Sequence, residues 1–224
     1  MKVCFIGVGS IGKRHMKNLK RIFEDRAESL QIDICRSGKG KPLEKEIESV
    51  ITESYNSLSD LPEDYDIIFI TNPTEYHLEV LKIVNNKAKH FFIEKPLTSK
   101  KQLGNFAEIQ EMAGKTYYVA CPLRYTKVIQ YAKEHIAKDQ IFGVRCISSS
   151  YLPEWRPGQD YRDTYSAHRD LGGGVAIDLI HEWDYIKYLF GMPDMVHKVI
   201  TRVSDLEIDS DDIACYIGKY RDKI

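Results

Sequence analysis

The sequence has little net charge and no long apolar run. Its 32 Lys and Arg residues offset 33 Asp and Glu residues to a formal charge of −1, so no bulk field favours nucleic acid or an anionic membrane surface. No stretch approaches the ~18 apolar residues of a membrane span, and the apolar N-terminus is interrupted at Lys13, too early for a secretory signal. We therefore expect a soluble protein with neither nucleic-acid nor membrane partners.

Cysteine is also scarce. The five cysteines are odd in number, widely scattered and free of CxxC spacing, which is typical of reduced thiols in the cytoplasm and disfavours disulfides or a zinc site. We expect a cytoplasmic chain without a metal. With 43% hydrophobic residues, the 224-residue chain can bury a sizeable core, in one large domain or two small ones.

Strand and helix patterns alternate over residues 1–121. The run from Asp66 to Thr71 is β-branched and aromatic, as a parallel strand buried on both faces requires. The other predicted strands are 2–6, 30–35, 90–94 and 116–120, with helices over 75–84 and 100–113. Such repeated units predict an α/β fold, a doubly wound parallel sheet of the Rossmann type.

The pattern changes after residue 121, and we predict a second, α+β domain over 122–224 with an open, mostly antiparallel sheet. A glycine triplet precedes an expected helix over 175–190, which ends at Gly191 and Pro193 as helices commonly do. The other expected elements are a helix over 127–137 and strands at 144–151, 195–203 and 213–217.

A glycine-rich loop joins the first strand to the first helix. Gly7-Val8-Gly9-Ser10-Ile11-Gly12 fits G-x-G-x-x-G in the strand–loop–helix context that the motif needs. Gly7 permits the tight turn, Gly9 lets a pyrophosphate approach the helix N-terminus, and Gly12 allows close helix–strand packing. We predict a dinucleotide site formed by Gly7, Gly9, Ser10, Ile11 and Gly12; a glycine turn in another α/β domain is the alternative.

The end of the second strand indicates which dinucleotide binds. In NAD-binding domains an acidic residue there contacts the ribose 2′-hydroxyl. Here the only acidic residue of the strand, Asp33, comes before its end, whereas Arg36, Ser37 and Lys39 follow it. These residues could hold a 2′-phosphate by charge-assisted hydrogen bonds, so NADP is the preferred cofactor. NAD beside a solvated basic loop is the alternative.

Glu94-Lys95-Pro96 follows a predicted central strand, at the edge where open α/β sheets bind ligands. The Lys95 ammonium could donate to a substrate oxygen and stabilise a developing alkoxide. Pro96 is a candidate for cis geometry. The alternative for Lys95 is an ordinary surface lysine.

The helix after Gly174 carries a polar stripe. At ~100° per residue, Asp178, His181, Glu182 and Tyr185 share one side. His181 could act as a general base on a hydroxyl, with Asp178 orienting it. A solvated helix face is the alternative, and no third residue has convincing spacing for a metal site.

Five motifs taken together resemble a known family. GVGSIGKRH, TNPTEYH, EKPL, LRYTKV and GGGVAIDLIHEWD occur in the order seen in the family of glucose-fructose oxidoreductase and inositol 2-dehydrogenase, called Gfo/Idh/MocA. The resemblance spans the chain and implies NAD(P)-dependent hydride transfer at a hydroxyl-bearing carbon of a sugar, cyclitol or derivative. It identifies Lys95 as the catalytic lysine, His181 as the catalytic histidine and Asp178 as the helix aspartate. It further implies cofactor contacts from Thr71, Asn72, Pro73, His77 and Glu94.

Two features depart from the family pattern. In many members the aspartate precedes the histidine by four residues, whereas Asp178 and His181 are three apart; either Asp178 is displaced or Glu182 takes its place. This form resembles bacterial members linked to surface-sugar biosynthesis. The chain is also shorter than most members, which predicts a C-terminally truncated protein whose incomplete sheet exposes an edge and a face, a possible surface for homo-oligomerisation.

The residues and the resemblance together predict an NAD(P)-dependent sugar dehydrogenase or reductase. Arginines and aromatic rings of the second domain could recognise an anionic or nucleotide-linked sugar. These substrate-binding candidates are Arg124, Tyr125, Trp155, Arg156, Tyr161, Arg162 and Arg169. The alternative is a truncated, non-catalytic dinucleotide-binding protein that serves as a sensor or interaction module.

Overall fold

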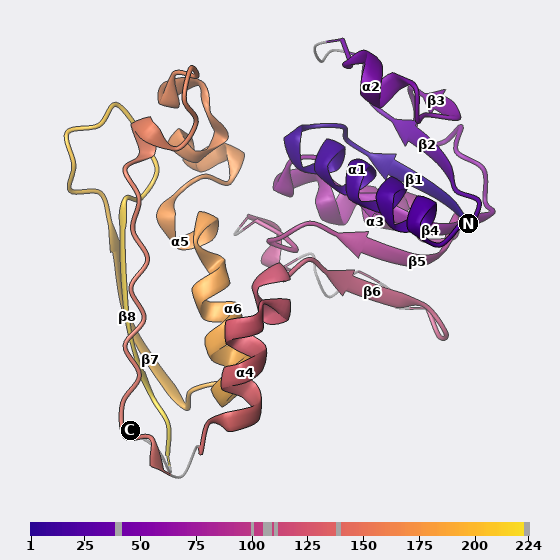
Figure 1. Ribbon diagram of the computed structural model, residues 1–224. Coiled ribbons are helices and arrows are strands. Elements are labelled where there is room, and N and C mark those ends of the chain that lie inside the picture. The colour runs from indigo at the N-terminus through magenta and orange to yellow at the C-terminus, as the bar shows by residue number, and fades with distance from the viewer. Residues whose placement is uncertain (39–41, 100, 105–108, 110–111, 138–139, 222–224) are drawn as a thin grey trace. The chain divides into compact units, whose positions relative to one another are not determined.

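The computed structural model describes residues 1–38, 42–99, 101–104, 109, 112–137 and 140–221. The chain divides into two compact units, unit 1 (Met1–Ala120) and unit 2 (Cys121–Ile224). In Figure 1 the elements of unit 1 run from indigo to the crimson of its last strand, and those of unit 2 run from crimson to yellow.

Unit 1 is built on a six-stranded parallel sheet in the order β3-β2-β1-β4-β5-β6 (Figure 1). The strands are β1 (Lys2–Ile6), β2 (Gln31–Cys35), β3 (Glu53–Tyr55), β4 (Tyr65–Ile70), β5 (Ala88–Ile93) and β6 (Thr116–Val119). The strand order reverses between β1 and β4, and the carboxyl ends of strands at such a switch point are where open α/β sheets bind ligands. The predicted doubly wound parallel sheet is confirmed.

Each face of this sheet buries its own core. On one face Phe5 and Phe69 stack at 4.4 Å between ring centroids, and Met16 of helix α1 (Ser10–Asp25) packs beside them. The other face packs Ile68 against Val84 of helix α3 (His77–Val84). This burial on both faces explains why β1 and β4 each contain a run of four apolar residues.

Some elements of unit 1 differ from the sequence-based expectation. Helix α2 (Lys45–Glu48) and the short edge strand β3 were not expected, and a 3-10 turn at Thr74–Tyr76 precedes α3. The expected helix over 100–113 lies in large part outside the described residues. Among the helices that the structure describes, none is both long and apolar enough to cross a membrane.

Unit 2 combines three helices with an antiparallel pair of strands, β7 (Met195–Thr201) and β8 (Ile213–Lys219) (Figure 1). This pair confirms the expected antiparallel sheet. The helices are α4 (Lys127–His135), α5 (Val175–Asp178) and α6 (Ile180–Phe190). Trp183 of α6 meets the ring of Tyr216 edge-on at 4.9 Å, which places α6 against one face of β8. A 3-10 turn at Pro122–Tyr125 precedes α4, and the described residues between α4 and α5 include 3-10 turns at Leu152–Glu154, Tyr161–Asp163, Tyr165–Ala167 and Arg169–Leu171.

Two expectations for unit 2 are wrong. The strand expected at 144–151 does not form; Ile147 and Tyr151 are 72% and 59% exposed, so this segment buries no apolar face. The helix expected over 175–190 breaks at Leu179, with φ −98° and ψ 31°. Asp211 holds the start of α5 separately, because its Oδ2 accepts from the Ala176 N–H at 2.9 Å.

Candidate functional site

The first candidate site lies in unit 1, where β1 passes into α1. Gly7 has φ +88°, and a Cβ there would lie 2.7 Å from the Asn72 backbone, so only glycine fits. A Cβ on Gly12 would lie 2.6 Å from the Gly7 carbonyl oxygen and 2.9 Å from Thr71 Oγ1. These two glycines therefore permit close packing within the protein.

Gly9 differs from both. It is the N-cap of α1 with φ −77°, it makes no side-chain cap, and no atom lies within 4 Å of the position that a Cβ would occupy. Ser10 and Ile11 begin the helix, whose first turn contains no acidic residue. The first N–H groups of a helix lack intrahelical partners and favour an anion. This open helix N-terminus fits the pyrophosphate of a dinucleotide.

The loop after β4 braces the glycine turn. Thr71 is 5% exposed, and its hydroxyl donates to the Gly7 carbonyl at 2.5 Å and lies 3.2 Å from that of Ile6. Asn72 Oδ1 is buried and has no hydrogen-bond partner among the described residues, whereas Pro73 is exposed. Thr71 thus stabilises the conformation of the glycine turn, and Asn72 Oδ1 is an acceptor that a ligand could use.

The loop after β5 carries Lys95. The Lys95–Pro96 bond is cis, and Lys95 is partly exposed. Glu94 is 9% exposed; its Oε2 accepts from the Lys95 N–H at 3.1 Å, and its Oε1 lies 2.6 Å from His15 Nε2. His77 is 1% exposed, between the carbonyls of Asn72 and Pro96. The turn that presents Lys95 is therefore held by hydrogen bonds on both sides.

The end of β2 presents a basic residue. Asp33 is fully buried and accepts from the Tyr65 hydroxyl at 2.9 Å, so it is part of the core and not of a ribose site. Burial raises the pKa of Tyr65, which keeps its hydroxyl a donor. Arg36 follows the strand, with its N–H on the Tyr55 carbonyl at 3.0 Å. Ser37 is exposed, and Lys39 lies outside the described residues.

The second candidate site, in unit 2, surrounds Asp178. This residue is 7% exposed at the end of α5, and its Oδ1 accepts from the Tyr165 hydroxyl at 2.7 Å. Burial and the Asp178 charge raise the pKa of Tyr165 to about 12, so the hydroxyl stays protonated at neutral pH. His181 is partly exposed in the first turn of α6, beyond the break at Leu179. Asp178 and His181 therefore do not share one continuous helix.

The arginine candidates differ in their contacts. Arg124 Nε donates to both Asp184 oxygens, at 2.8 and 3.0 Å. Burial alone would raise the pKa of Asp184, but the hydrogen bonds from Arg124 and Cys121 and the charge of Arg124 together outweigh it, and the pKa lies below its ordinary value. Arg162 donates to Asp160 and, at 2.8 Å, to Glu207.

The remaining substrate-binding candidates lie mostly at the surface. Arg156 is exposed, with its guanidinium 5.5 Å from the centre of the Tyr165 ring. Arg169 is exposed and Tyr125 is 66% exposed. The Tyr161 hydroxyl accepts from the Glu207 N–H at 3.3 Å.

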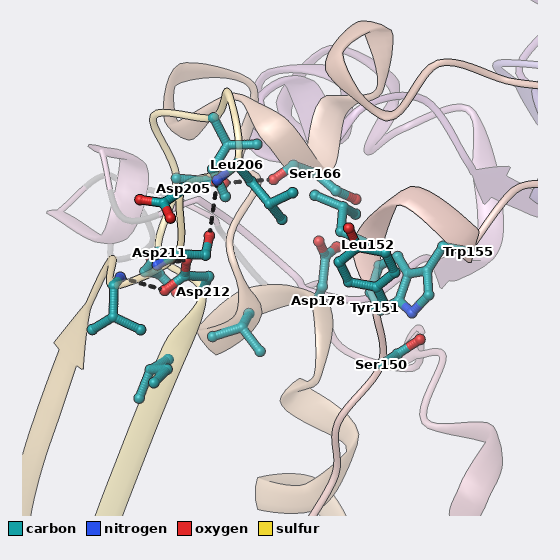
Figure 2. A pocket seen from close by; sticks show the side chains of 16 residues that line it. Ser150, Tyr151, Leu152, Trp155, Ser166, Asp178, Asp205, Leu206, Asp211 and Asp212 are labelled. Carbon is teal, nitrogen blue, oxygen red and sulfur yellow. Dashed lines mark hydrogen bonds between the residues drawn. The ribbon is translucent and has the colours of Figure 1, made fainter.

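A cavity of about 620 Å³ opens beside Asp178. Figure 2 shows Tyr151 and Trp155 on one side of Asp178 and Asp211 and Asp212 on the other. Asp205 lines the cavity together with these three aspartates, and none of the lining residues, all of them described, is basic. The cavity therefore disfavours an anionic group and offers acceptors to a ligand rich in hydroxyls.

Two contacts of these sites were missed at the sequence level. His15 falls within the GVGSIGKRH motif but was assigned no role, although its position four residues after Ile11 places both on one face of α1. Tyr165 carried no signal, because nothing in its spacing connects it with Asp178. Within the described residues, no group of three His, Cys, Asp or Glu side chains could hold a metal ion.

Comparisons with known proteins identify what the chain is similar to. The model of the oxidoreductase family GFO_IDH_MocA, described by its NAD-binding Rossmann fold, matches residues 1–121. An uncharacterised oxidoreductase of Bacillus subtilis, YrbE, is 28% identical over 83% of this chain and 52% of its own length. Myo-inositol 2-dehydrogenase of Thermotoga maritima is 24% identical over 85% of this chain and 55% of its own. The chain thus spans about half the length of these two relatives.

Solved structures share the fold. The WlbA dehydrogenase of Chromobacterium violaceum, in complex with NADH and UDP-GlcNAcA, superposes with a TM-score of 0.77 at 19% identity, over 99% of this chain and 64% of the other. The putative oxidoreductase YvaA of Bacillus subtilis gives a TM-score of 0.75 at 20% identity, over 100% and 62%.

Proposed function

The chain belongs to the GFO_IDH_MocA family of oxidoreductases with an NAD-binding Rossmann fold, and from that premise we propose that it transfers hydride between a nicotinamide dinucleotide and a hydroxyl-bearing carbon of a sugar, cyclitol or derivative. The observation that carries the proposal is the open N-terminus of α1 at Gly9, which lies at the same carboxyl edge of the parallel sheet as the turn that presents Lys95. Unit 1 is the cofactor-binding domain in this proposal, and unit 2 the substrate-binding domain.

The proposal gives each candidate residue a role. The nicotinamide, when bound, supplies the hydride acceptor or donor. The Lys95 ammonium donates to the substrate oxygen and stabilises negative charge that develops there. His181 takes the hydroxyl proton when the substrate is oxidised, and the buried Asp178, fixed by Tyr165, supports its charge.

We propose NADP as the preferred dinucleotide. Asp33 is buried beneath the sheet surface, so no acidic side chain of β2 is available to the ribose, and Arg36 stands directly after the strand. A guanidinium pairs with a phosphate through two parallel hydrogen bonds. NAD is the cofactor given in the description of the family, and it is the alternative.

The substrate class follows from the cavity beside Asp178. Its volume of about 620 Å³ lies within the range of about 300–1,000 Å³ common for small-molecule sites. Its carboxylates accept hydrogen bonds from hydroxyls, and Trp155 offers an apolar ring face. We therefore place a neutral, polyhydroxylated ring in the cavity. Myo-inositol, which appears in the name of one relative, is such a ring. Surface-sugar biosynthesis is one process that would use this reaction.

The test separates binding from turnover. NADPH and NADH are titrated by their own fluorescence, and inositols, hexoses, uronates and sugar nucleotides are then screened for absorbance change at the nicotinamide band. Lys95→Met should keep NADPH binding and lower turnover by about 10²–10⁴-fold, the usual contribution of a proton donor. Lys89→Met, on the exposed side of β5 beside Asp66, is the matched control and should behave like the wild type.

Two outcomes would decide against this function. Turnover unaffected by Lys95→Met would remove Lys95 from the chemistry. Tight dinucleotide binding with no turnover across the panel would instead favour the non-catalytic sensor or interaction module.

We also propose self-association through the outer face of the β7–β8 sheet. All seven residues of β7 are exposed, and Val199 and Ile217, on the face opposite Tyr216, are 61% and 73% exposed. Light scattering after size exclusion should find a dimer that Val199→Lys converts to monomer, while Lys198→Ala, on the other face, has no effect. A monomeric wild type would refute this.

A further inference from the structure

The Lys95 turn is supported from its N-terminal side by a side chain of the glycine-loop helix. Glu94 Oε1 lies 2.6 Å from His15 Nε2, and Glu94 Oε2 accepts the Lys95 N–H at 3.1 Å. The His15 ring is fixed edge-on against Phe92, with 5.0 Å between ring centroids. A chain of two hydrogen bonds therefore runs from α1 to the Lys95 backbone.

From its C-terminal side the same turn is supported by α3. His77 Nδ1 lies 3.1 Å from the Pro96 carbonyl, and His77 Nε2 lies 2.8 Å from the Asn72 carbonyl. The ring is 1% exposed. Carbonyl oxygens only accept and a neutral imidazole carries a single N–H, so His77 donates to one of these two carbonyls, and we assign the N–H to Nδ1, which faces Pro96. His77 thus joins the loop after β4 to the loop after β5.

We propose that His15 and His77 are positioning residues that hold the Lys95 turn between α1 and α3. This inference rests on the proposed role of Lys95. Each histidine acts on the main chain beside Lys95: His15 through the Glu94 carboxylate, and His77 through the Pro96 carbonyl. Because α1 also carries the open N-terminus at Gly9, the dinucleotide site and the lysine turn share one support.

The position of Lys95 then depends on individual ring nitrogens, which amide side chains can replace one at a time. An asparagine amide reaches about as far as Nδ1 of histidine and a glutamine amide about as far as Nε2. His77→Asn therefore keeps the donor to Pro96, whereas His77→Gln directs its amide toward Asn72 and removes the donor to Pro96. In the same way, His15→Gln keeps the donor to Glu94 and His15→Asn removes it.

The experiment follows the Lys95 amide and Cε resonances in the ¹⁵N,¹³C-labelled full chain, together with the hydrogen-exchange rate of the Lys95 amide. We expect His77→Gln and His15→Asn to shift these resonances and speed the exchange. His77→Asn and His15→Gln should leave both close to the wild type. Val84→Ala, buried at the other end of α3, controls for a general loss of stability and should leave the Lys95 resonances in place.

Three results would overturn the inference: unshifted Lys95 resonances in both histidine-to-amide variants that remove a donor, equal shifts in the paired Asn and Gln variants, or an equal shift in Val84→Ala. The readout needs neither substrate nor turnover. An inactive wild type would therefore count against the proposed function while leaving this inference intact, and an active enzyme with unshifted resonances would count against this inference alone.

Discussion

Replacing Gly9 by alanine should weaken dinucleotide binding without harming the fold. An added Cβ at Gly9 meets no atom within 4 Å, and its φ of −77° suits any residue. Alanine is a poorer N-cap than glycine but reduces the entropy of the unfolded chain, so these opposing effects keep the change in unfolding free energy within about 1 kcal/mol. In the proposed site, the methyl group would fill space that the pyrophosphate needs.

The loss of affinity follows from the hydrogen bonds that the methyl group displaces. A hydrogen bond to a charged group contributes about 1.5–3 kcal/mol, so losing one raises the dissociation constant about 10- to 150-fold. Gly12→Ala should do the reverse: its Cβ would lie 2.6 Å from the Gly7 carbonyl oxygen, and such overpacking costs about 1–3 kcal/mol of stability.

The assay is a fluorescence titration of NADPH and NADH, paired with urea unfolding followed by far-UV circular dichroism, because Trp155 and Trp183 both lie in unit 2 and do not report on unit 1. Gly104→Ala, another glycine with open space around its Cβ position and no positive φ, is the matched control. Wild-type affinity in a folded Gly9→Ala protein would refute the pyrophosphate site.

Three further predictions follow from single contacts. Arg36→Ala should weaken NADPH binding about 10- to 150-fold, by loss of one charge-assisted contact, and leave NADH unchanged; a preference for NADH in the wild type would overturn the NADP proposal. Burial lowers the pKa of His77, so the unfolded chain takes up a proton that the folded ring resists. Stability should therefore fall as the pH drops below about 6.5, by at most about 1.4 kcal/mol per pH unit, and titrations of the wild type and His77→Asn should differ in this slope. Arg124→Met leaves the Asp184 carboxylate without its guanidinium partner and should cost about 1.5–3 kcal/mol, measured by Trp183 fluorescence in urea; wild-type stability in Arg124→Lys would show that charge alone, not the two-oxygen contact, is needed.

The strands of unit 1 were predictable because both of their faces are buried. Between Asp66 and Thr71 the sequence is an unbroken apolar run, and the structure places β4 at Tyr65–Ile70. Burial on two sides favours apolar side chains along the whole strand, so the sequence alone carries the signal. The short edge strand β3 has two exposed residues among its three, and no comparable constraint marks it.

Unit 2 was harder to predict because distant residues decide its local structure. The break at Leu179 separates the four-residue helix α5 from α6. Asp211, in the loop before β8, accepts a hydrogen bond from the start of α5. Helical periodicity over 175–190 contains no trace of that contact. The segment 144–151 was expected to be a strand, yet the structure gives it none, because strand-forming residues do not by themselves supply a partner strand.

The G-x-G-x-x-G pattern identifies a candidate site, but it does not show which of its three glycines the fold requires and which one is open to a ligand. Gly7 and Gly12 would each place a Cβ within 3 Å of the protein itself, whereas Gly9 would place one in open space. A change at either of the first two acts on folding, and only a change at Gly9 acts on the ligand alone. Thr71 and Asn72 differ in the same way. The Thr71 hydroxyl donates to the Gly7 carbonyl, whereas Asn72 Oδ1 has no hydrogen-bond partner among the described residues. We therefore expect the dinucleotide to contact Gly9, on the side where a Cβ would lie in open space, and Asn72 Oδ1.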